Sequence, residues 1–151
     1  MGWLARLLGT DATRDLLADL AEDYRAEAAQ AAHLRAQAER ARYPQVATAL
    51  RRLAEIEERH AKWIRDHLVN RGGQTPVVAV EASRGANQWQ RAVAALHDAQ
   101  AKRRRLVEQI AHWDPEEPEV VELLRRVEQE DVHELEVYEG IVMRSDPQAA
   151  D

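Results

Sequence analysis

Proline and glycine, the residues that most often interrupt helices, are few in this chain and fall between long uninterrupted stretches. The chain of 151 residues has five prolines and six glycines, and residues 10–43, 45–71, 86–114 and 119–139 contain neither. These stretches are rich in Ala, Leu, Glu and Arg, which are strong helix formers. The sequence therefore predicts an all-α fold built from four long helices.

The spacing of the predicted helices indicates how they are connected. The second helix is expected to begin at Pro44, which suits a first helical turn, and to end at Gly72 and Gly73. About fifteen residues then precede the third helix, and extended chain of this length reaches roughly 45–50 Å, more than the roughly 40 Å of such a helix. This connection can run the length of a bundle. It predicts a ferritin-like four-helix bundle, with two antiparallel helical hairpins joined by a long crossover.

The predicted helices divide the chain into three parts. Residues 1–10 are expected to form a short amphipathic segment, with apolar side chains on one helical side. Such a segment would pack on the bundle or on a second subunit, or dock on a membrane surface or a partner. Residues 11–145 form the predicted bundle, and residues 146–151 a frayed tail.

Composition excludes several classes of function. The formal net charge is -6, which argues against nucleic acid as a main partner. The basic run 102–105 is interpreted as a solvated helix face. There is no cysteine, which excludes disulfides, iron–sulfur clusters and thiol catalysis. No apolar run is long enough to be a transmembrane segment, and we expect a cytoplasmic protein.

Two Glu-x-x-His motifs, Glu57-x-x-His60 and Glu130-x-x-His133, lie in the second and fourth predicted helices. Residues three apart on a helix project from one face. Ferritin-like bundles bind two metal ions with one such motif from each of two helices and one carboxylate from each of the others. Glu57, His60 and Glu130 also fall on otherwise apolar rows, where an unpaired carboxylate is costly unless a metal ion or an arginine balances it. The motifs therefore predict a metal site.

The two remaining helices offer further candidate ligands. Antiparallel partners in a hairpin lie at equal distances from the turn, which places Glu27 level with the first motif. The same argument places Asp98 level with the second motif, with His97 beside it. Orientation on the helix favours His97, whereas charge balance favours Asp98, which we predict as the ligand. On the fourth helix, Glu134 could replace or support His133.

With these motifs, the sequence resembles the rubrerythrin branch of the ferritin-like superfamily. The resemblance is clearest over residues 43–61 (YPQVATALRRLAEIEERHA) and weaker over residues 120–134. It implies a dinuclear iron centre, with manganese as the alternative metal, that reacts with peroxide or oxygen in a protein that is often a homodimer. It also implies four ligands, of which the glutamates would bridge the two ions: Glu57, His60, Glu130 and His133.

The sequence departs from the pattern of that family in three places. Gapless spacing through the first hairpin puts Tyr24 at the position of the ligand on the first helix, so that Glu27, one turn on, has to replace it. The third helix lacks the characteristic glutamates, which leaves Asp98 as its acidic candidate. The cysteine-rich iron module of full-length rubrerythrins is missing, so the chain would need an external electron donor.

Two hypotheses of function follow. The first is a non-haem dinuclear iron protein that reduces peroxide or oxygen, or oxidises ferrous iron, as a rubrerythrin-like peroxidase or a ferroxidase. The second is a metal-free helical bundle that acts as an interaction or adaptor protein, using residues 1–10 or an exposed helix face. A quinone hydroxylase of related fold would need apolar membrane-facing helices, which this polar chain does not show.

Overall fold

The computed structural model describes the backbone of residues 2–79 and 84–150 and the side chains of residues 11–79 and 84–150. This part of the chain contains four α-helices and no strand, as predicted. The helices are α1 (Gly2–Arg40), α2 (Pro44–Asn70), α3 (Gln88–Trp113) and α4 (Pro118–Arg144).

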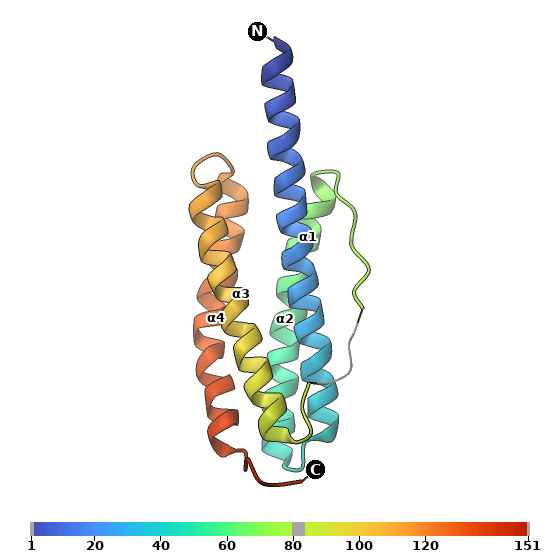
Figure 1. Cartoon of the computed structure of the whole chain (residues 1–151), viewed down its shortest axis with the longest axis vertical. Coiled ribbons are helices and arrows are strands. Elements are labelled where there is room, and N and C mark those ends of the chain that lie inside the picture. The colour runs from blue at the N-terminus through green and yellow to red at the C-terminus, as the bar shows by residue number, and fades with distance from the viewer. Residues whose placement is uncertain (1, 80–83, 151) are drawn as a thin grey trace.

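The helices form two hairpins joined by a crossover, which confirms the predicted ferritin-like arrangement (Figure 1). α1 packs against α2, and α3 packs against α4, across short turns. α2 ends at one end of the bundle and α3 begins at the other, so the two helices run parallel and the connection between them spans the bundle (Figure 1). This arrangement brings all four helices past a common middle level.

The backbone of the N-terminal segment continues directly into the bundle. The backbone of α1 is helical without a break from Gly2, and its first turns project beyond the ends of the neighbouring helices (Figure 1). Gly9 lies inside this helix, because a single glycine costs only about 1 kcal/mol relative to alanine and does not by itself end a helix. The side chains of residues 1–10 lie outside the described residues, so their predicted packing stays a prediction.

Local sequence signals set the starts of the later helices. Tyr43 is extended and Pro44 occupies the first turn of α2, as expected of a residue that precedes proline. At the start of α3, the side chain of Asn87 accepts a hydrogen bond from the backbone N–H of Gln90 at 2.9 Å. Asn87 also donates to the carbonyl of Pro147 at 3.1 Å, which ties the non-helical C-terminal residues to the start of α3.

The core consists of two apolar clusters separated by a polar layer. The cluster nearer the start of α1 contains Leu16, Leu20, Ile64, Leu68, Leu106, Trp113, Val120, Val121, Leu123, Leu124 and Val127. The other contains Leu34, Ala38, Val46, Leu50, Leu53, Ala54, Ala92, Ala95, Ala99, Tyr138 and Ile141. On every helix, the residues that form the polar layer lie in sequence between the residues of the one apolar cluster and those of the other. The polar side chains are thus enclosed by apolar layers above and below.

Candidate metal centre

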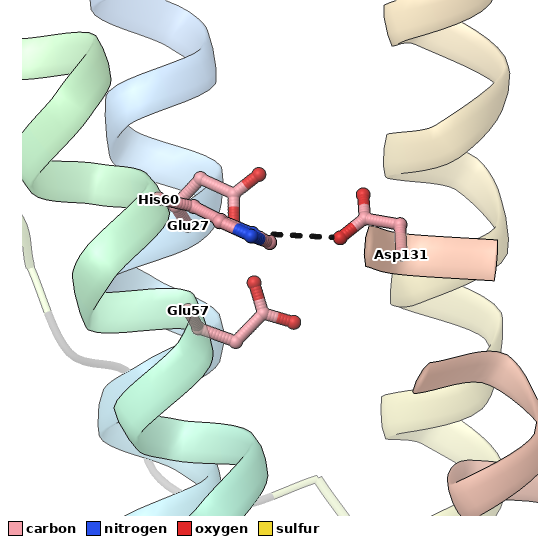
Figure 2. Close-up of side chains that lie close together, drawn as sticks. All are labelled: Glu27, Glu57, His60 and Asp131. Atoms are coloured by element: carbon pink, nitrogen blue, oxygen red, sulfur yellow. Dashed lines mark ion pairs between the residues drawn. The ribbon is translucent and has the colours of Figure 1, made fainter. Parts of the chain in front are cut away.

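Six charged or titratable side chains meet in the polar layer, each at most 5% exposed. Figure 2 shows four of them converging from α1, α2 and α4, with the carboxylate of Asp131 facing the ring of His60. The six are Glu27 from α1, Glu57 and His60 from α2, Lys102 from α3, and Asp131 and Glu134 from α4.

Lys102 places a positive charge among three of these acids. Its Nζ donates to Glu27 Oε2 at 2.9 Å, contacts Glu57 Oε2, and lies 3.7 Å from Asp131 Oδ1. Burial lowers the pKa of the lysine, but the charges of Glu27, Glu57 and Asp131 outweigh this effect and hold the pKa well above its ordinary value. The ammonium group therefore stays charged at neutral pH.

His60 bridges the buried acids and the outer edge of the site. Its Nε2 lies 2.7 Å from Glu130 Oε2, and its Nδ1 lies 3.6 Å from both Glu27 Oε2 and Asp131 Oδ1. Burial lowers the pKa of the imidazole, but the neighbouring carboxylates of Glu27, Glu130 and Asp131 raise it to about 9. Glu130 is also paired with Arg59 at 2.6 Å. The two ring nitrogens thus face acids on opposite sides of the ring.

Glu57 and Glu27 lie side by side but differ in charge. Burial and the negative charge of Glu27 raise the pKa of Glu57 to about 8, although Lys102 opposes the shift. Burial also pushes the pKa of Glu27 upward, but the charge of Lys102 and the proximity of Glu57 and His60 leave it below its ordinary value. Tyr138 donates a hydrogen bond to Glu57 Oε1 at 3.1 Å, which fixes the orientation of that carboxyl group.

Glu134 and Asp131 are the least satisfied acids of the site. Among the described residues, neither carboxylate oxygen of either side chain has a hydrogen-bond partner. Burial and the charges of Glu57 and Asp131 raise the pKa of Glu134 to about 9. Burial raises the pKa of Asp131 to about 6, against the opposing charge of Lys102. Buried oxygens without partners are rare in folded proteins, and they fit a site that accepts a cation.

The described part of the chain contains two overlapping groups of potential ligand atoms, and the atoms within each group all lie within 4.8 Å of one another. The larger consists of Glu27, Glu57, His60 and Asp131, and the smaller of His60, Glu130 and Glu134. Carboxylate oxygens and imidazole nitrogens are the donors that iron and manganese accept in proteins.

A groove of about 560 Å³ between α2 and α4 leads to the smaller group. Glu130 and Glu134 form part of its wall, together with apolar side chains that include Leu53, Ile56 and Val137. This groove gives small molecules a route to the outer edge of the site.

The family model described as Rubrerythrin matches residues 19–137. The chain belongs to the rubrerythrin family. The match includes every member of the two ligand groups, and it confirms the resemblance found in the sequence. None of the curated proteins matches the chain significantly. Within the described residues, every helix is too short or too polar to serve as a membrane span.

Membership of the rubrerythrin family implies a metal centre, and the donor set fits one in part. The smaller group offers one imidazole nitrogen and two carboxylates, and the oxygens of Glu134 lack partners in the described structure. The larger group already contains a buried positive charge, because the Lys102 ammonium contacts two of its acids, whereas the cation beside the smaller group, Arg59, is 46% exposed. The two groups are therefore not equivalent.

The structure brings four of the six predicted ligands together and leaves two outside. Four belong to the ligand groups: Glu27, Glu57, His60 and Glu130. Asp98 is 39% exposed and lies 3.3 Å from Arg84, on the outer surface of the bundle. His97 and His133 are both exposed, and His133 lines the outer groove. The ligand role of Asp98 and His133 stays a prediction without support from their position.

Sequence reasoning missed Asp131 and Lys102, and it treated Glu134 only as an alternative. The interpretation of residues 102–105 as a solvated face was wrong for Lys102, which is 4% exposed. A signal was present in the sequence. The row Ala95, Ala99, Lys102, Leu106 has helical spacing, and each of its members is buried.

Proposed function

We propose that this rubrerythrin-family protein binds iron in the centre of its bundle and uses it to reduce peroxide or oxygen, or to oxidise ferrous iron. The observation that carries the proposal is Glu134. Its side chain is 5% exposed and neither oxygen has a partner among the described residues, yet it lies beside His60 and Glu130 at the groove. A buried acid in this state is costly unless a cation balances it.

The residues around the site would bind and orient the ligands. His60 is held between Glu130 on one side and Glu27 on the other, which fixes the plane of the imidazole. Arg59 restricts Glu130 from the solvent side. When bound, iron would supply redox chemistry between its ferrous and ferric states, for which carboxylates and imidazole are suitable ligands.

The groove between α2 and α4 would admit a small oxidant. Its wall combines apolar side chains with Arg52 and Arg59 near the acids of the site. A groove of this size is wide enough to admit a small molecule such as hydrogen peroxide. Because the chain has no cysteine, electrons would come from an external electron donor. Manganese as the metal, a homodimeric assembly and a cytoplasmic location belong to the same proposal.

The test is anaerobic loading with ferrous iron, removal of unbound metal, and addition of hydrogen peroxide while ferric absorbance and peroxide are measured. We expect iron to be retained and to be oxidised faster than the same iron in buffer. The Glu134→Gln variant should retain less iron. Failure of the parent to retain iron, or oxidation no faster than in buffer, would contradict the proposal.

A second candidate function is the metal-free adaptor, which the position of Lys102 favours. Its ammonium already balances part of the acidic cluster without a metal. The backbone of α1 projects beyond the bundle and would then present a helix to a partner (Figure 1). A parent protein that binds neither iron nor manganese would favour this alternative.

A further inference from the structure

The Lys102 ammonium group lies where a cation would have to bind in the larger ligand group. That group consists of Glu27, Glu57, His60 and Asp131. Lys102 Nζ is 2.9 Å from Glu27 Oε2, contacts Glu57 Oε2, and lies 3.7 Å from Asp131 Oδ1. The same carboxylates that would bind a metal ion therefore already surround the ammonium group.

A metal ion and the ammonium group could not share these oxygens. Both are positively charged, and their repulsion would be poorly screened because Lys102 is 4% exposed. The acids come from three different helices and hold the ammonium from several sides. The cation in this half of the site is thus part of the protein.

The smaller ligand group has a different character. His60 Nε2 lies 2.7 Å from Glu130 Oε2, and the two oxygens of Glu134 lack hydrogen-bond partners among the described residues. Glu134 is only 5% exposed, so water does not solvate it as it would a surface acid. An unpartnered, buried carboxylate beside an imidazole indicates a place for a cation.

We propose that Lys102 replaces one of the two metal ions expected of the rubrerythrin family. Each chain then binds a single ion, through His60, Glu130 and Glu134. This inference rests on the proposed function, because it specifies how many ions the proposed site takes and where. It replaces the predicted dinuclear centre with a centre of one metal ion and one ammonium group.

The alternative is that Lys102 moves when metal binds. Lys102 also lines an outer groove between α1 and α3, and Asp98 is another of the residues that line this groove. A lysine that swung outward toward Asp98 would vacate the larger group and admit a second ion. The stoichiometry of metal binding separates a fixed lysine from a mobile one.

The experiment is a titration of the full chain with Mn(II), with metal analysis after removal of unbound ions and electron paramagnetic resonance of the loaded protein. We expect one Mn(II) per parent chain, with the resolved hyperfine lines of an isolated ion. The Lys102→Gln variant should bind two ions and show the broadened spectrum of a coupled pair. Lys102→Arg keeps the charge and should still bind one.

Two further variants locate the ion and control for surface binding. Glu134→Gln should weaken Mn(II) binding at least about tenfold, since even residues that only support metal ligands often contribute that much. Lys62→Gln removes the same single charge from an exposed lysine outside the site, and it should leave the stoichiometry unchanged. If Lys102→Gln does not fold, the stoichiometry and spectrum of the parent still decide the question.

Each other outcome has a defined meaning. Two ions in the parent would overturn the role of Lys102 and leave the proposed function intact. One ion in both the parent and Lys102→Gln would show that the lysine does not exclude the second ion. Unchanged binding by Glu134→Gln would show that the ion lies elsewhere. Either result overturns the inference. No Mn(II) and no iron in the parent would overturn the inference and the proposed function together.

Discussion

Replacing Glu134 with glutamine should stabilise the metal-free protein at neutral pH while it impairs metal binding. Burial and neighbouring acids raise the pKa of Glu134 to about 9, so the folded protein keeps this carboxyl protonated at pH 7. The unfolded chain ionises it at its ordinary pKa of 4.5. Glutamine resembles the protonated acid in shape and does not titrate.

The sign and size of the effect follow from the two pKa values. A group whose pKa is raised on folding favours the folded state fully below pH 4.5, and this contribution is lost as pH rises toward 9. At pH 7 the loss covers 2.5 pH units, each worth about 1.4 kcal/mol, which gives a cost of about 3 kcal/mol for keeping Glu134. At pH 5 the same reasoning gives less than about 1 kcal/mol.

The assay is urea unfolding of metal-free protein at pH 5 and pH 7 in the presence of a chelator, monitored by circular dichroism. Glu134→Gln should exceed the parent in free energy of unfolding by about 3 kcal/mol at pH 7 and by little at pH 5. Glu136→Gln, an exposed change on the same helix, is the matched control and should behave like the parent. An equal gain at both pH values, or none at pH 7, would refute the reasoning.

Metal should reduce the stability advantage of Glu134→Gln over the parent. A ligand present at one hundred times its dissociation constant stabilises the folded state by about 2.7 kcal/mol. Mn(II) at that excess should raise the unfolding free energy of the parent by this amount and that of Glu134→Gln by at least about 1 kcal/mol less. A variant that gains as much as the parent would show that Glu134 is not a ligand, whatever its effect on the metal-free protein.

Three further predictions concern the surrounding bundle. Burial raises the pKa of Asp23 to about 6 despite Arg105, so the free energy of unfolding should fall by about 3 kcal/mol as pH rises from 3.8 to 6. Urea unfolding of Asp23→Asn should lack this decrease. Leu20→Ala removes a fully buried side chain and should lower the unfolding free energy by about 3–5 kcal/mol without loss of helical signal. Tyr138→Phe removes the donor to Glu57 and should destabilise by about 1–3 kcal/mol, measured by the same unfolding assay.

The helices and their order were predictable because they depend on local signals. Pro44 marks the start of α2, and the long segment before Gln88 allows the crossover. The first half of the site was also predictable, because the hairpin turn fixes the level of α1 against α2. Glu27 therefore falls beside Glu57 and His60, as the depth argument required.

The second half of the site was harder to predict because it depends on the rotation of α3 and α4. On α4, the predicted ligands Glu130 and His133 each lie one residue before a buried acid, and Val137 is 41% exposed whereas Tyr138 is buried. A shift of one residue turns the helix by about 100° and moves Asp131 and Glu134 inward in place of His133. Hydrophobicity alone does not decide which of Val137 and Tyr138 faces the core, because both side chains are apolar enough to be buried.

Lys102 escaped prediction for a different reason. A lysine in a basic run is normally a surface residue, and its place in a row with Ala99 and Leu106 does not identify the acids that hold it. The acids that hold it come from α1, α2 and α4, which are far apart in sequence. No local pattern on α3 reveals that the opposing helices present carboxylates at the same level.

The position of Lys102 also separates folding from metal binding in this protein. Where buried acids depend on a metal, the apo chain is destabilised and folding is coupled to metal uptake. Here the ammonium group balances Glu27 and Glu57 from within the chain, so the bundle does not depend on a metal for that half of its core. Glu134 remains the exception, at a cost of about 3 kcal/mol in the metal-free state. A bundle with no use for a cation would be more stable with a neutral side chain there, and the presence of an acid at this position therefore favours the metal-binding function over the metal-free one.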